Sequence, residues 1–388
     1  MSLNAGCETI SGEKQMASHL GILYRWSNTL HTYFPVLTYW QVTGLAVFSM
    51  GVVLARSCQL MVVAEALGFV GKADSVHRRL KRWLANEQIE MAVVIPLWIQ
   101  WVLSSYAGEE LEVLVDETKL GSRIGVLMVS LAYRGRAIPL IWRCYREGDA
   151  AAYPAEGQVG MIVAMLATVK LYLPLGCGCR VQADQGIGNS SRLMPALHKA
   201  GWHFLFRVKE TRMFTTRSGF RFCLRDIAFQ GRQGAAIGWL YTRSYRLVLG
   251  TLHVIWLEGY DEPWFLFTND PLACATAYAR RFWQEEGFRD LKSGGWQWQG
   301  SFVRDPQHMQ RLILVLALAY AWMTTLGTLS FSLPIAVRQQ IVAADEQARF
   351  SVFRQGLRSF KRLIFLAHRY IHVDLFFLPL PASHPLLC

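Results

Sequence analysis

Apolar residues recur at helical spacing through the first hundred residues of the chain. The clearest case is segment 75–84, whose apolar positions fall at i, i+4, i+7 and i+8 and form one stripe: Val76, Leu80, Trp83 and Leu84. A shorter helix-like run, 60–67, precedes it and ends at Gly68. We therefore predict a helical region over residues 1–107.

The pattern changes to short β-branched and apolar runs after Gly108. Three strands are predicted at 112–120, 124–133 and 137–144, with turns at Gly121-Ser122 and Arg134-Gly135. A helix (158–172), a strand (180–184), a helix (189–200) and a strand (203–209) follow. This is the element order of a ribonuclease-H-like α/β sheet, although a fold alone does not specify a function.

The remaining segments divide the rest of the chain. Residues 211–262 alternate over short stretches such as 245–250 and 253–258, which indicates a β-rich insertion. A strand at 263–269 and two long helices, 274–292 and 307–326, complete the core. The predicted organisation is a helical region (1–107), a core in two parts (108–210 and 263–330) around the insertion (211–262), and a helical C-terminal region with a Pro-rich tail (331–388).

Composition narrows the class of protein. The chain has 388 residues, is 52% hydrophobic, and carries 40 Lys and Arg against 28 Asp and Glu, for a net charge of +12. The hydrophobic content excludes a disordered chain, and the basic balance favours a polyanionic partner. Eight cysteines without a C-x-x-C pair fit scattered thiols in a reducing cytoplasm. The apolar stretches 91–107 and 312–326 are short for a membrane span, so we interpret both as buried helices.

Two aspartates stand at strand positions where a carboxylate is costly unless it has a partner. Asp116 lies inside the apolar run LVDETKL, and Asp184 ends another strand and precedes a Gln-Gly-Ile-Gly turn. If the two strands are neighbours, both carboxylates meet at one edge of the sheet and favour a hard cation such as Mg²⁺. Glu117 is discounted because adjacent strand residues point to opposite faces.

A third acid occurs with three other functional side chains on one predicted helix face. Tyr278, Arg281, Glu285 and Lys292 fall within about 60° of one another if the α-helix is continuous to Lys292. A solvated face with an Arg281–Glu285 pair is the alternative, but such a face has no need of a tyrosine. A phenol, a guanidinium, a carboxylate and an ammonium on one face fit a metal-binding acid flanked by phosphate-binding groups.

The pattern Tyr-x2-Arg-x3-Glu-x6-Lys, with the aspartates of LVDET and QADQG, resembles the signature of DDE transposases of bacterial insertion sequences. The branch is insertion sequence family four, and the resemblance extends from about residue 111 to residue 320. One departure is Gln185, where relatives often carry Arg.

The resemblance implies that Asp116, Asp184 and Glu285 hold two divalent metal ions, Mg²⁺ with Mn²⁺ as a substitute, for phosphodiester hydrolysis and strand transfer. It also assigns phosphate contacts near the cleaved end to five residues: Tyr278, Arg281, Lys292, Arg207 and Lys209.

Trp264 resembles the position at which a relative stacks an indole against a flipped base. Base stacking is worth about 1–3 kcal/mol, and base flipping accompanies a hairpin intermediate on the transposon end. Trp264 lies in the apolar run PWFLFT, so a core position is the alternative. Trp296 and Trp298 are left open between DNA contact and packing.

The expected partners are the double-stranded transposon ends and target DNA, bound by a homodimer in a synaptic complex in the bacterial cytoplasm, associated with the nucleoid and not with a membrane. The basic residues Arg78, Arg79 and Arg82 lie off the apolar stripe of 75–84, so segments 60–67 and 75–84 resemble a helix-turn-helix. A solvated basic helix is the alternative there. For the whole chain, the alternatives are a domesticated DNA-binding relative and another ribonuclease-H-like nuclease.

Overall fold

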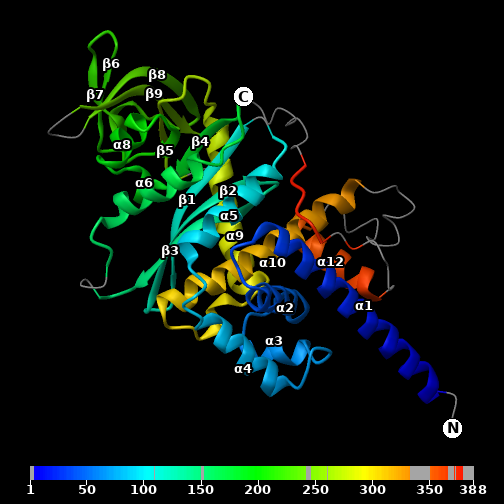
Figure 1. The fold of residues 1–388 in the computed structure, drawn as a ribbon. Coiled ribbons are helices and arrows are strands. Elements are labelled where there is room, and N and C mark those ends of the chain that lie inside the picture. The colour runs from blue at the N-terminus through cyan, green and yellow to red at the C-terminus, as the bar shows by residue number, and fades with distance from the viewer. Residues whose placement is uncertain are drawn as a thin grey trace.

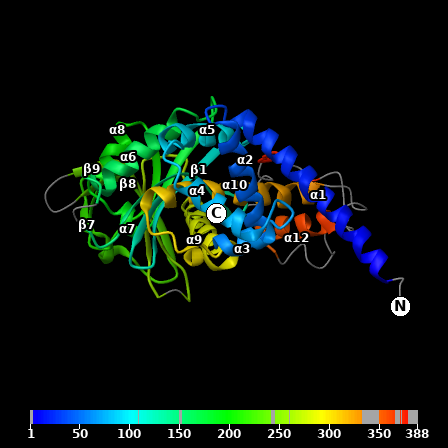
Figure 2. The ribbon, with the colours of Figure 1, turned by 60° about the horizontal axis from the view of Figure 1, so that its bottom comes forward.

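The computed structural model describes residues 4–108, 110–149, 153–241, 246–259, 261–332, 350–365, 371 and 373–378. The prolines predicted to mark the tail, Pro379, Pro381 and Pro385, lie outside the described residues. Five helices open the chain: α1 (Asn4–Tyr33), α2 (Tyr39–Ala55), α3 (Leu60–Ala66), α4 (Ala73–Leu84) and α5 (Met91–Ser104). The N-terminal end of helix α1 extends away from the rest of the molecule (Figure 2), whereas its second half is buried in the core through Trp26 and Leu30.

Local sequence accounts for two of these helices. Helix α2 begins with a capping box, in which the Gln41 amide donates to Thr38 Oγ1 and the Thr38 amide donates to Gln41 Oε1. Helix α4 buries the whole apolar stripe predicted for it and exposes its arginines, which confirms that part of the sequence interpretation.

Ten strands form one sheet in the order β3-β2-β1-β4-β5-β10-β9-β8-β6-β7 (Figure 1). The strands are β1 (Glu110–Leu120), β2 (Ile124–Tyr133), β3 (Arg136–Arg146), β4 (Gly178–Ala183), β5 (His203–Arg207), β6 (Met213–Thr216), β7 (Arg221–Cys223), β8 (Arg232–Tyr241), β9 (Arg246–Trp256) and β10 (Trp264–Thr268). Strands β3, β2 and β1 are antiparallel, and β1, β4 and β5 are parallel. This part of the sheet has the predicted ribonuclease-H-like order.

Strands β6 to β9 extend the same sheet beyond β10. Strand β9 covers most of the two alternating segments, 245–250 and 253–258, and continues through Gly250 without a break. A Cβ atom at Gly250 would lie 2.2 Å from the Thr268 carbonyl oxygen, so glycine permits the close approach of β10.

The helices of the core are α6 (Gly157–Lys170), α7 (Gln185–Gly188), α8 (Leu193–Lys199), α9 (Phe282–Arg289), α10 (Pro306–Ser332) and α12 (Val352–Phe365). Short turns of other helix types are η1 (Leu224–Ile227), η2 (Ala275–Arg281), η3 (Asp290–Gly294) and η4 (Trp298–Ser301). The prediction of one continuous helix over 274–292 was wrong. The segment forms a 3₁₀ turn (η2), an α-helix (α9) and a π turn (η3) in succession. The predicted helix 189–200 is likewise reduced to α8.

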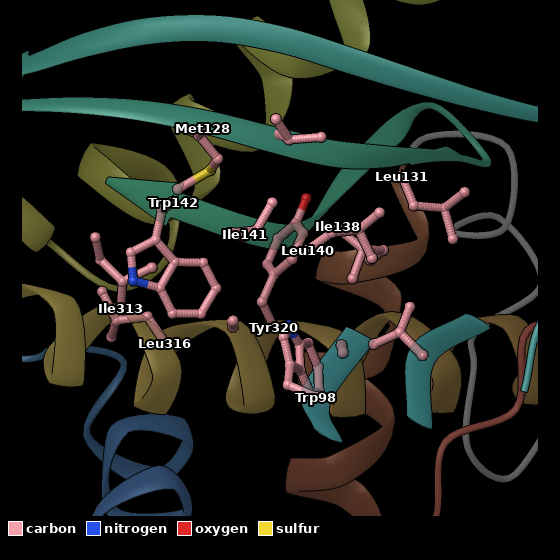
Figure 3. Packing of buried hydrophobic residues seen from close by; sticks show 14 of the residues in the cluster. Trp98, Met128, Leu131, Ile138, Leu140, Ile141, Trp142, Ile313, Leu316 and Tyr320 are labelled. Carbon is pink, nitrogen blue, oxygen red and sulfur yellow. The ribbon is translucent and has the colours of Figure 1, made fainter. Parts of the chain in front are cut away.

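Helix α10 is the central helix of the core. It has the length and composition of a membrane span, but 94% of its apolar window is buried within the protein, as expected for the core helix that we predicted. Figure 3 shows Trp142 and Ile141 of the sheet above Ile313 and Leu316 of α10. The Trp142 indole donates to the Gln310 carbonyl oxygen at 3.0 Å, which fixes α10 against β3.

Candidate active site

The register of two parallel strands brings the two aspartates together. Val115 of β1 pairs with Ala183, the last residue of β4, so Asp116 within β1 and Asp184 just after β4 take adjacent positions. The two strands are neighbours, which meets the condition under which the two carboxylates were expected to lie together. Asp184 also caps α7, since its Oδ1 accepts from the Ile187 amide at 3.0 Å.

The environment of Asp116 disfavours the ionised form of its carboxyl group. Burial raises its pKa to about 6, the nearby carboxylates Asp184 and Glu285 add to the rise, and a hydrogen bond from the Glu117 amide and the charge of Arg281 oppose it. Three acidic side chains thus influence one another at this edge of the sheet.

Glu117 faces the other side of the sheet, as predicted from strand alternation. Its Oε1 accepts from the Tyr145 hydroxyl of β3, and its Oε2 accepts from Gln158 Nε2 of α6 at 2.7 Å. Its two oxygens are therefore engaged by structural partners behind the sheet.

The helical segment that carries Glu285 crosses the acidic edge with a change of helix type. Tyr278 and Arg281 are three residues apart in η2, so in a 3₁₀ turn they lie on one line. Tyr278 is buried, and its hydroxyl donates to the Ala183 carbonyl oxygen at 3.2 Å, next to Asp184. This hydrogen bond therefore fixes the position of η2 relative to the end of β4.

Glu285 is turned toward Arg281, which donates a hydrogen bond to its Oε1. Among the described residues, no three His, Cys, Asp or Glu side chains stand close enough together to hold a metal ion. The structure therefore brings Asp116 and Asp184 together and leaves Glu285 within electrostatic reach of Asp116 but paired elsewhere. An all-oxygen donor set around a destabilised carboxylate nevertheless fits a hard divalent cation, which would offset the mutual repulsion.

Lys292 and Trp264 lie beside the acidic edge. The Lys292 ammonium donates to Thr118 Oγ1 at 2.6 Å, two residues beyond Asp116 on the same face of β1. Burial lowers the lysine pKa, and the charge of Asp116 opposes that shift. The half-buried Trp264 ring packs edge-on against Tyr278 at 5.7 Å and lies 5.9 Å from the ring of Phe282.

A buried ionic network that we did not predict supports the start of this segment. Arg180 bridges Glu112 at 2.7 Å and Asp270 at 2.5 Å, and Arg280 contacts Glu112 at 3.1 Å. Gln182 donates to both Glu112 and the Ala277 carbonyl oxygen, which ties η2 to the sheet. A charged residue inside the strand CRVQA was the available sequence signal, because such a residue requires a partner.

A second ionic cluster supports the far end of the segment. Arg136 of β3 pairs with Asp290 at 2.6 Å and Glu286 at 3.2 Å, and the Tyr320 hydroxyl donates to Asp290 at 3.3 Å. Burial raises the Asp290 pKa, and Arg136 opposes the rise. The two networks hold η2, α9 and η3 against the sheet at both ends.

Other predicted residues take varied positions. Arg207 pairs with the exposed Glu262 at 3.1 Å, and Lys209 is exposed. Gln185 donates to the Val208 carbonyl oxygen at 3.3 Å. Trp296 and Trp298 are both fully buried, which decides the open question in favour of packing. The three α4 arginines, Arg78, Arg79 and Arg82, are exposed.

Comparison with known proteins gives one family match and no curated relative. Residues 152–322 match the model of the transposase DDE domain. No curated protein matches the chain. The matched segment contains Asp184 and the whole of η2, α9 and η3, and Asp116 stands ahead of it on the strand paired with β4. The matched domain indicates that the chain is an enzyme with the metal-dependent nuclease and transferase chemistry of a DDE transposase.

Proposed function

We propose that this transposase excises and inserts an insertion sequence of family four by a cut-and-paste route with a hairpin intermediate at the transposon end. The observation that carries the proposal is the Val115–Ala183 register, which places Asp116 beside Asp184 under the segment that bears Glu285. The signature residues Tyr278, Arg281, Glu285 and Lys292 support the assignment to this branch.

Asp116, Asp184 and Glu285 are the proposed ligands of two Mg²⁺ ions, for which Mn²⁺ can substitute. When bound, the metal would activate a water or a DNA 3′-hydroxyl and stabilise the leaving oxygen. The Arg281 guanidinium, which here pairs with Glu285, and the Lys292 ammonium are cations beside the acidic edge. We assign both to DNA phosphates near the cleaved end.

The remaining DNA contacts follow from exposure and charge. Arg78, Arg79 and Arg82 line the solvent side of α4, the second helix of a pair that resembles a helix-turn-helix. Arg207 and Lys209 lie at and just beyond the end of β5, next in the sheet to the strand that leads to Asp184. We assign these residues to the transposon end, held by a homodimer in a synaptic complex in which each subunit contacts both ends, in the nucleoid of a bacterial cell.

A plasmid assay tests the proposal. A supercoiled donor carries the inverted repeats found in the flanks of the gene and is incubated with the protein and Mg²⁺. We expect double-strand excision by the wild type and none by Glu285→Ala. Absence of excision by the wild type, or full excision by Glu285→Ala, would contradict an active transposase and favour a domesticated DNA-binding relative. Light scattering of the DNA-bound protein tests the dimer.

Strand transfer distinguishes the proposal from a ribonuclease-H-like nuclease of another kind. A labelled, pre-cleaved end is mixed with a target plasmid, and covalent joining of end and target is measured. A transposase joins them, whereas a nuclease that only cleaves leaves the label on the short fragment.

A further inference from the structure

Helices α3 and α4, residues 60–84, are fastened at both ends to the segment that matches the DDE domain. They lie in the helical part of the molecule, apart from β6 to β9 (Figures 1 and 2). The loop before α3 contacts residues 296–300, and the end of α4 contacts Arg311 of α10. Each contact includes a hydrogen bond to a backbone atom, which fixes the course of the chain there.

The first fastening, which we call the loop clasp, joins residues 57–59 to residues 296–300. The Cys58 amide donates to the Trp296 carbonyl oxygen at 2.7 Å, and Ser57 Oγ donates to Gln297 Oε1 at 3.3 Å. Gly300 lies so near that an added Cβ would be 2.5 Å from Gln59 Nε2. Residues 296–300 follow η3, so the loop clasp begins four residues after Lys292.

The second fastening, the arginine clasp, joins α10 to the end of α4. Arg311 is 4% exposed, and it donates to the carbonyl oxygens of Leu84 at 2.9 Å and Ile89 at 3.2 Å. Leu84 is the last residue of α4, where carbonyl groups lack partners within the helix and a cation is favoured. Because Gln310 is bonded to Trp142 of β3, this clasp links α4 to the sheet through one helix turn.

The two clasps constrain the position of the exposed arginines of α4 relative to the carboxylates of Asp116 and Asp184. Helix α4 also packs against the core through its buried apolar stripe, and the Trp83 indole donates to the Gln41 carbonyl oxygen at 2.9 Å. The clasps add fixed points at the two ends of the α3–α4 pair and so oppose a slide of the pair along the DNA. Successive phosphates along one DNA strand are separated by about 3.4 Å of helix rise. A shift of that size would therefore present a different phosphodiester to Asp116 and Asp184.

We propose that the loop clasp and the arginine clasp set which phosphodiester is cut, by holding α4 at a fixed distance from the acidic edge. Ser57, Gln297 and Arg311 are then positioning residues that act through α4 without touching the DNA. This inference rests on the proposed function, in which α4 binds the transposon end.

Mapping of the cut position tests the inference with the full-length protein. A duplex bearing the inverted repeat from the gene's flank is end-labelled, incubated with protein and Mg²⁺, and resolved at single nucleotides. The variants are Arg311→Met, Arg311→Lys, and Ser57→Ala combined with Gln297→Gly. Gln297 has φ 52°, so glycine keeps its backbone while removing the side-chain bond. The matched control is Arg225→Met, an exposed arginine outside both clasps.

We expect one cut position for the wild type and for Arg225→Met. Arg311→Met and the loop-clasp double variant should spread cleavage over neighbouring phosphodiesters while affinity for the end is kept, and Arg311→Lys should restore part of the single position. A variant that only lost stability would cut less at the same position. If both clasp variants cut at the wild-type position, the proposal is overturned.

A companion variant separates this inference from the function on which it depends. The triple variant Arg78→Ala, Arg79→Ala, Arg82→Ala should lose affinity for the end. If it binds normally, α4 does not contact DNA, and the clasps cannot set the cut through it. If it loses affinity while clasp variants keep a single cut position, only the clasp proposal is wrong. If Arg311→Met does not fold, the loop-clasp variant, in which Ser57 is buried and Gln297 is exposed, decides the same question.

Discussion

Val115 of β1 lies opposite Ala183 of β4, and each is followed by an aspartate. The pairing is parallel, so Asp116, which remains within β1, and Asp184, which follows the end of β4, lie side by side. Burial of Asp116 and its repulsion by Asp184 make this edge unfavourable for an ionised carboxylate without a counter-charge. A bound cation would therefore offset both the burial of the Asp116 carboxylate and its repulsion by Asp184.

Substitution of Asp116 and of its neighbour Glu117 should have different effects, because their side chains lie on opposite faces of β1. We expect Asp116→Asn to reduce Mg²⁺-dependent cleavage by more than the roughly 10–100-fold typical of changing an outer-shell partner. Glu117→Gln should keep cleavage, because Glu117 contacts Tyr145 and Gln158 behind the sheet. It should instead cost stability by about 1 kcal/mol through the altered hydrogen bonds. Equal loss of cleavage in both variants would argue against this division of roles.

Asp116 should make the metal-free protein less stable as the pH rises. Its folded pKa of about 6 is above the unfolded value of about 3.9, so the folded state holds the proton more tightly. Stability is lost between about pH 4 and pH 6 and stays lost above, by an amount of about 1–3 kcal/mol. Asp116→Asn should therefore raise the melting temperature in chelator at pH 7.5 and leave it nearly unchanged at pH 4.

Added Mg²⁺ provides the control for that measurement. Binding to the folded state alone stabilises it in proportion to the logarithm of metal concentration. The wild type should gain stability from Mg²⁺ at pH 7.5, and Asp116→Asn should gain much less. A wild type indifferent to Mg²⁺ would mean that the acidic edge binds no metal in the absence of DNA.

Removal of Arg180 should be far more damaging than removal of Arg207. Arg180→Met leaves Glu112 and Asp270 buried without their bridge, a change that typically costs about 3–5 kcal/mol. Arg207 pairs with Glu262, whose side chain is 77% exposed, so Arg207→Met should cost less than about 1 kcal/mol. Urea unfolding of both variants measures the difference. Similar losses would show that the network contributes little.

The local sequence pattern was sufficient to predict the strands around Asp116. Strand β2 begins and ends at the predicted residues. The predicted turns form at Gly121 and Arg134-Gly135, where the backbone has the positive φ angles that glycine adopts readily. The adjacency of Asp116 and Asp184 was expected on the condition that their strands are neighbours, and the parallel pairing of β1 with β4 meets that condition. These features depend on residues close in sequence or on a simple rule of topology.

Features that depend on distant partners were missed. Nothing near Glu112 indicates that Arg180 and Arg280 share its carboxylate, because those contacts span 68 and 168 residues. The succession of 3₁₀, α and π turns at 275–294 arises from tertiary fixing at both ends, by Gln182 and by Arg136. Periodicity cannot separate these helix types over so few residues. Glu285 was assigned by its pattern, and its pairing with Arg281 was visible only in the structure.

Trp264 provides a test of the hairpin step that leaves the first cleavage intact. Its ring is half-buried against Tyr278 and Phe282, beside the acidic edge. If it stacks on a flipped base, Trp264→Ala should lose about 1–3 kcal/mol in the hairpin step alone, or roughly 5–150-fold in its rate. First-strand nicking should persist, and Trp264→Phe should recover part of the loss because it retains a stacking face. Denaturing gels of labelled ends resolve nicks from hairpins. If nicking and hairpin formation fall together, Trp264 acts only by packing against Tyr278, and base stacking is excluded as its role.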